Sequence, residues 1–227
     1  MTTDLEQVPF TANEFIDNPE NRCPCVLVLD TSGSMQGQPI EELNEGLAQF
    51  KRELLTDEMA TKRVEVAVIG FGPVQVLASF ATPDAFTPPR LEANGDTPMG
   101  AAIQQAISLV EQRKQEYKQN GISYYRPWIF LITDGEPTDA YAPAVQALQD
   151  GQRRKSFEFF AVGVRGANMN VLKQMSGERA PLTLKGLQFR EMFRWLSNSL
   201  SSKSQSQVLD APVPVENPTA PQGWASV

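Results

Sequence analysis

The stretch Val26-Leu27-Val28-Leu29-Asp30-Thr31-Ser32-Gly33-Ser34 joins four consecutive apolar residues to a short polar loop. An apolar run without alternation is typical of a parallel strand that is buried on both faces. The loop that follows supplies a carboxylate and two hydroxyl groups, which are the kind of oxygen ligands that hard cations prefer. Because Asp and Ser beside glycine also form simple turns, the stretch alone leaves both a turn and a cation site open.

A later segment repeats this design. Trp128-Ile129-Phe130-Leu131-Ile132 is continuously apolar and runs into Thr133-Asp134-Gly135. We therefore expect Asp30 and Asp134 to stand at the carboxyl ends of two strands. In an open α/β sheet, ligands bind at this edge, where the strand order reverses.

The rest of the chain alternates between strand and helix patterns, which predicts a Rossmann-like, doubly wound α/β sheet with helices on both faces. We expect six strands in the order 3-2-1-4-5-6, with the third an antiparallel edge strand. The expected strands lie at about residues 26–29, 64–69, 74–78, 128–132, 157–164 and 182–184, and the expected helices at about 39–55, 98–117, 142–154, 169–176 and 189–201.

The division of the chain follows from composition. We expect a polar amino-terminal segment over residues 1–20, one folded domain over 21–203, and a flexible proline-rich tail over 204–227. The net charge of −7 argues against a nucleic-acid or anionic-membrane partner. Without a transmembrane-length apolar run or a signal-like start, the protein is expected to be soluble and cytoplasmic.

The ligand chemistry is narrowed by the absence of histidine from the sequence. This absence excludes Ser-His-Asp and Cys-His nucleophilic chemistry and any histidine-bound metal. Cys23 and Cys25 are too few for a zinc site, and a disulfide between them would be strained, so we expect reduced thiols. A metal must therefore be held by oxygen, which favours Mg²⁺ first and Mn²⁺ or Ca²⁺ next.

A third segment is expected at the same sheet edge. The proline-rich connection over residues 82–96 is long, and long connections are more often functional than idle. It must return the chain from the antiparallel edge strand, and it delivers Thr97 to the edge where Asp30 and Asp134 stand. The alternative is that Thr97 only caps the helix that begins at Pro98.

Five side chains form the candidate metal site: Asp30, Ser32, Ser34, Thr97 and Asp134. Two carboxylates about 6 Å apart would repel each other by roughly 3 kcal/mol at an effective dielectric of about 20, and a divalent cation would reverse that cost. Two charges and three neutral oxygens leave at least one octahedral position open. A partner's carboxylate or a polarised water can occupy it.

This pattern resembles the metal-ion-dependent adhesion site of von Willebrand factor type A domains, in which Asp-x-Ser-x-Ser precedes a distant Thr and a distant Asp. The resemblance covers about residues 24–201. It implies that Ser32, Ser34 and Thr97 are direct or near-direct ligands and that the carboxylates act partly through waters. It also implies a protein-protein interaction module, not an enzyme, and related domains switch between closed and open forms through their last helix.

Within that family, three stretches look most like the bacterial TerY-like proteins of tellurite-resistance and related stress operons. They are Asp96-Thr97-Pro98-Met99-Gly100, Tyr124-Tyr125-Arg126-Pro127-Trp128 and Asp134-Gly135-Glu136-Pro137-Thr138-Asp139. This likeness implies a cytoplasmic adaptor. Its partners would be kinase-like or phosphatase-like proteins of the same operon, bound through a carboxylate.

Two alternatives remain open. A Mg²⁺-dependent phosphohydrolase is suggested by a strand that ends in Asp, but position 32 is serine where the similar haloacid-dehalogenase motif has its general acid. A subunit of a chelatase or AAA-type assembly would use the same cation as a docking point.

Other conspicuous residues have simpler interpretations. Tyr124, Tyr125 and Trp128 are expected to pack at the sheet end away from the metal. Arg153-Arg154-Lys155 is expected to follow a helix and stay solvated. Asp96, Gln36 and Glu136 are candidates for the surroundings of the ion or for partner contacts.

Overall fold

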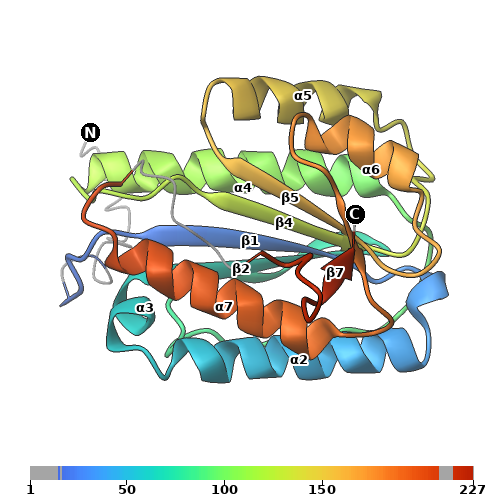
Figure 1. Cartoon of the computed structure of the whole chain (residues 1–227). Coiled ribbons are helices and arrows are strands. Elements are labelled where there is room, and N and C mark those ends of the chain that lie inside the picture. The colour runs from blue at the N-terminus through green and yellow to red at the C-terminus, as the bar shows by residue number, and fades with distance from the viewer. Residues whose placement is uncertain (1–14, 16, 210–216, 227) are drawn as a thin grey trace, which may run out of the picture.

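One sheet with helices on both faces forms the domain (Figure 1). The computed structural model describes residue 15 and residues 17–209 and 217–226. Within them, the strand order is β3-β2-β1-β4-β5-β6-β7. The strands are β1 (Cys23–Asp30), β2 (Val64–Phe71), β3 (Val74–Ala81), β4 (Trp128–Thr133), β5 (Glu158–Gly163), β6 (Leu182–Leu184) and β7 (Ala225–Ser226).

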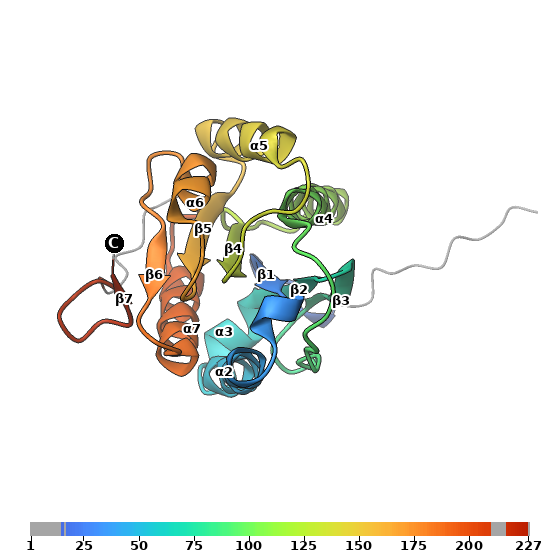
Figure 2. The same cartoon turned by 90° about the vertical axis from the view of Figure 1, so that its right-hand side faces the viewer.

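The helices form two layers, which Figure 2 shows in a view turned by 90°. One layer holds α2 (Gln38–Leu54), α3 (Glu58–Arg63) and α7 (Phe189–Gln205). The other holds α4 (Met99–Gln119), α5 (Ala142–Arg153) and α6 (Met169–Ser176). A 3-10 turn, η1 (Gly33–Met35), follows β1.

The two central strands are apolar on both faces because each face is covered by a helix layer. Every residue of β1 and β4 is buried. Leu27 and Phe130 pack in the core on the α2 and α7 side, whereas Val26 and Leu131 pack in the core on the α4 and α5 side. β1 and β4 are parallel neighbours, so their carboxyl ends meet at one edge of the sheet.

The doubly wound α/β prediction is confirmed. All six predicted strands are present in the predicted order, and β3 is antiparallel to β2. The structure corrects the count, because β7 adds a seventh strand, antiparallel to β6, where only one antiparallel edge strand was expected. Helix α3 was also missed; its amino-terminal amides, at Met59 and Ala60, donate to the carboxylate of Asp57.

Composition predicted a flexible tail over residues 204–227, and its described part belongs to the folded domain, whereas residues 210–216 and 227, like residues 1–14 and 16 of the predicted amino-terminal segment, lie outside the described residues. Helix α7 continues to Gln205, and residues 217–226 return to the sheet through β7. Trp224 is 4% exposed, and its ring lies 5.5 Å from that of Trp195 in α7. Burying an indole supplies a large apolar contact from a single residue, which the average composition of the segment did not indicate.

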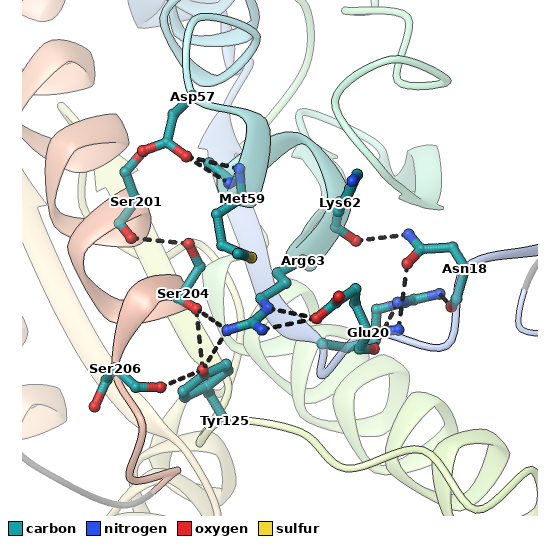
Figure 3. Close-up of polar contacts among 12 residues, drawn as sticks. Asn18, Glu20, Asp57, Met59, Lys62, Arg63, Tyr125, Ser201, Ser204 and Ser206 are labelled. Atoms are coloured by element: carbon teal, nitrogen blue, oxygen red, sulfur yellow. Dashed lines mark hydrogen bonds and ion pairs between the residues drawn. The ribbon is translucent and has the colours of Figure 1, made fainter.

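The carboxyl-terminal end of α7 is hydrogen-bonded to Tyr125, which precedes β4, and to Arg63 at the end of α3, as Figure 3 shows. The hydroxyl of Tyr125 lies 2.6 Å from the carbonyl oxygen of Ser206 and 3.0 Å from that of Ser204. Arg63 donates to the same Ser204 carbonyl at 2.6 Å and pairs with Glu20 at 2.7 Å. The predicted packing role is confirmed for Tyr125 and Trp128, which are both buried.

Two groups of buried polar or titratable side chains lie at the amino-terminal ends of β1 and β2. Cys23 and Cys25 are free thiols, and burial raises the pKa of Cys23 to about 12. On the neighbouring strand, beside Pro24, the carboxylate of Glu65 at the start of β2 accepts hydrogen bonds from Arg22, Arg113 and Tyr117. The buried charge of Glu65 is thus paired twice, which such a group requires.

Candidate metal centre

The carboxyl ends of β1 and β4 bring the two predicted carboxylates together. Asp30 is the last residue of β1, and Asp134 directly follows Thr133, the last residue of β4. The register pairs Leu29 with Ile132, so the two strand ends are adjacent. Both residues therefore stand at the switch point of the sheet.

A chain of hydrogen bonds joins four of the five predicted residues. The Ser34 hydroxyl donates to Asp134 Oδ1 at 2.7 Å and lies 2.9 Å from the Ser32 hydroxyl. The Ser32 amide donates to Asp30 Oδ1 at 2.9 Å. The loop after β1 is thus more than a local turn, because its side chains reach across to the loop after β4.

Thr97 completes the group from the third segment. A methyl group added to Gly135 would lie 3.3 Å from Thr97 Oγ1 and 3.8 Å from Asp30 Oδ2. Both oxygens therefore border the same small space beside Gly135. Thr97 is 7% exposed, so its hydroxyl is held in the interior of the site.

The alternative of Thr97 as a helix cap does not hold. The cap position of α4 is Pro98, which has no side-chain cap bond. The first-turn amides of Gly100 and Ala101 donate instead to the two carboxylate oxygens of Asp139, at 3.0 and 2.8 Å. The Thr97 hydroxyl therefore does not cap α4 and is available to bind an ion.

Backbone hydrogen bonds fix the three segments to one another. The Gly33 amide donates to the Gly95 carbonyl at 3.0 Å, and the Asn94 amide to the Thr31 carbonyl at 2.7 Å. Thr138 holds Thr97 from both sides, because its amide donates to the Thr97 carbonyl and its hydroxyl accepts from the Thr97 amide. The ligand oxygens are consequently positioned before any ion binds.

The electrostatics favour a positive charge at this point. Burial raises the pKa of the Asp30 carboxyl, and the nearby charge of Asp134 adds to that rise. Hydrogen bonds from Ser32 and from the Thr133 hydroxyl, which lies 2.5 Å from Oδ2, act in the opposite direction. A cation would stabilise both ionised carboxylates.

The donor set fits a hard divalent ion. The described residues contain no cluster of three or more His, Cys, Asp or Glu side chains. Two carboxylates and three hydroxyls thus form the set, and oxygen ligands of this kind suit Mg²⁺ or Mn²⁺ with water completing the coordination.

The three residues expected around the ion or at a partner contact have different surroundings. Gln36 and Asp96 are exposed, and Glu136 accepts a hydrogen bond from Asn168 at 2.9 Å. The supporting residues that sequence reasoning missed are Thr133, Thr138 and Asp139. These residues lie close to Asp134 in the sequence, which hinted at a role in the site. Their hydrogen-bond partners lie on other segments, so the sequence alone did not reveal that role.

Comparison with known proteins identifies a family for most of the chain. Residues 25–190 match the family model of the von Willebrand factor type A domain. No curated protein sequence matches the chain. No helix in the described part of the chain is long and apolar enough to span a bilayer.

Solved structures of similar fold come from diverse sources. The pilus adhesin SpaC from Lactobacillus rhamnosus GG superposes with a TM-score of 0.64 at 13% identity, covering 80% of this chain and 30% of the adhesin. Proximal thread matrix protein 1 from the mussel byssus, with a zinc-occupied MIDAS motif, gives 0.57 at 15% identity over 80% and 48%. The amino-terminal domain of TFIIH p34 gives 0.56 at 13% identity over 78% and 97%. The chain thus spans less than half of the adhesin and of the byssus protein.

Proposed function

The chain belongs to the von Willebrand factor type A domain family, and from that premise we propose that it is a divalent-cation-dependent protein interaction module. The observation that carries the proposal is the convergence of Asp30, Ser32, Ser34, Thr97 and Asp134 from three distant segments at one sheet edge. The cation would present an open coordination position, and a carboxylate of a partner protein would fill it.

The donor chemistry assigns roles to the five residues. The hydroxyls of Ser32, Ser34 and Thr97 would bind the ion directly, and the carboxylates of Asp30 and Asp134 would act largely through bound water. Mg²⁺ is the first candidate, Mn²⁺ the second and Ca²⁺ the third. The zinc-occupied motif of the byssus protein supports a divalent cation in general and does not select among these.

Binding without catalysis is the second part of the proposal. The sequence has no histidine, and Ser32 stands where a phosphohydrolase of the dehalogenase type would need an acid. A bound cation supplies electrophilic attraction for an anionic group, which is sufficient for docking. A role in a chelatase or AAA-type assembly would use the same docking point.

We also propose a cellular setting. The three stretches around Thr97, Trp128 and Asp134 resemble TerY-like proteins, which favours a cytoplasmic adaptor of a bacterial tellurite-resistance or stress-response system. Its partners would be kinase-like or phosphatase-like proteins of the same operon.

Calorimetric titration with Mg²⁺ and Mn²⁺ tests the site. The wild type should bind one ion, whereas Asp30→Ala and Thr97→Ala should show no measurable binding. Asp84→Asn removes an exposed carboxylate outside the site and is the matched control, with wild-type affinity expected. Equal binding by all four proteins would refute the metal centre.

Capture of partners tests the function. Protein retained from a bacterial lysate with Mg²⁺ should be lost with chelator and with Asp30→Ala. Turnover of a generic phosphoester that requires Mg²⁺ and disappears in Asp30→Ala would instead favour the phosphohydrolase.

A further inference from the structure

A second feature lies at the opposite end of the sheet from the metal centre. A groove of about 840 Å³ opens beside the first residues of β4 and β5, Trp128 and Glu158. Phe157 and Phe160 supply part of its apolar wall. None of the five metal-site residues lines it, so it is a separate site.

Positive charge is in excess in this groove. Its described lining contains five cationic side chains and two carboxylates, Glu158 and Glu178, and one of the cations, Arg153, also pairs with Asp150 of α5. The five are Arg126, Arg153, Lys155, Arg179 and Lys203. This balance contrasts with the net charge of −7 of the whole chain.

One carboxylate, that of Glu158, lies within ion-pair distance of three of these cations. Glu158 lies 3.0 Å from Arg179 and 3.6 Å from Lys203, with Arg126 at 3.9 Å. Lys203 is only 3% exposed, and its ammonium group lies 5.1 Å from the centre of the Trp128 ring. Arg179 and Lys203 together carry two positive charges against the single negative charge of Glu158, in a partly desolvated place where an anion is favoured.

The backbone of Lys155, which lines the groove, is in the left-handed region. Lys155 has φ of 56° and is the only described non-glycine residue with positive φ. It follows α5 in a Schellman arrangement, with the Ser156 amide bonded to the Gly151 carbonyl at 2.8 Å and the Lys155 amide to Gln152 at 2.9 Å. Glycine is the residue that this position favours, so a lysine here has a conformational cost and adds a positive side chain to the groove.

A buried donor in the groove lacks an acceptor. Trp128 is 3% exposed, and its indole N–H has no hydrogen-bond partner among the described residues. A buried donor without an acceptor is unfavourable. An oxygen-rich ligand would provide the acceptor and neutralise the surplus cations.

We propose that this groove binds a small phosphorylated molecule through the cations around Glu158 and the indole N–H of Trp128. Phosphate oxygens accept several charge-assisted hydrogen bonds at once, and guanidinium groups such as that of Arg179 match them in geometry. The proposal does not depend on the metal centre, because the two sites share no residue.

Calorimetric titration with inorganic tripolyphosphate in the presence of EDTA tests the groove. The wild type and Asp30→Ala should bind it equally. Arg179→Gln should weaken binding about tenfold, as expected for the loss of a charge-assisted contact. Arg52→Gln, which removes an exposed arginine from α2 on the other face, should bind as the wild type.

Lys155→Gly separates binding from folding. Glycine suits the positive φ, so the variant should unfold at a higher temperature than the wild type and yet bind tripolyphosphate several-fold more weakly. Higher stability with unchanged affinity would overturn the role of Lys155. Absence of tripolyphosphate binding, or binding of a hexaglutamate peptide in its place, would overturn the proposal.

Discussion

Asp30 illustrates how a single residue combines function with a cost to stability. It is fully buried, and two hydrogen bonds, from the Ser32 amide and the Thr133 hydroxyl, orient its carboxylate. These contacts only partly offset the effect of burial, since the pKa of the carboxyl is still raised. The ionised carboxylate of Asp30 is therefore unfavourable in the metal-free protein, and a bound cation would offset that cost.

Asp30→Asn should abolish Mg²⁺ binding and raise the melting temperature of the metal-free protein at neutral pH. Because the folded-state pKa of Asp30 is raised, the folded wild type loses stability as pH rises through the range between the unfolded and folded pKa values. The neutral amide lacks this dependence. Melting curves in EDTA should therefore converge below the unfolded pKa, and a difference that persists there would contradict this explanation.

At the scale of elements, helix α7 is held at several points. Trp195 packs against Trp224, Lys203 pairs with Glu158, and the end of the helix is bonded to Tyr125 and Arg63. The shift of this helix suggested by related domains would have to break these contacts. The described conformation is accordingly one in which α7 is anchored.

Tyr125→Phe tests this anchor. Loss of the hydroxyl removes the contacts to the Ser204 and Ser206 carbonyls, so the free energy of unfolding should fall by about 1 kcal/mol. Amide exchange near the end of α7 should become faster. Tyr141→Phe, at the start of α5, is the control, and equal exchange in both variants would contradict the anchoring role.

The sequence predicted the elements that have long periodic patterns. Strands β1 and β4 and helices such as α2 were found within a few residues of their observed ends. The short α3 was missed because six residues carry too little periodicity, and β7 because its order depends on the distant Trp195. In the same way, the five candidate ligands were visible as a pattern, but the roles of Thr138 and Asp139 required knowledge of which segments meet.

At the scale of the whole molecule, the carboxyl-terminal residues 217–226 complete one side of the sheet. β7 covers the edge of β6, and Trp224 joins the core formed by β4, β5 and α7. The domain therefore includes residues far beyond the last predicted helix.

Trp224→Ala should destabilise the protein by about 3 kcal/mol, as expected for truncation of a buried indole. Chemical denaturation would measure this loss. Val208→Ala, at a side chain that is 60% exposed, should change stability little. A similar small effect of both substitutions would show that the return strand contributes little to the fold.

The two ends of β4 carry opposite electrical character. Carboxylates gather where the strand finishes at Thr133, and cations gather where it starts at Trp128. This separation contributes a dipole component along the strand, and a dipole turns a molecule in the field of a charged partner before contact. Loading a divalent ion would cancel two negative charges at one end and so reduce the dipole. Metal occupancy would then change the orientation in which charged molecules first encounter the domain.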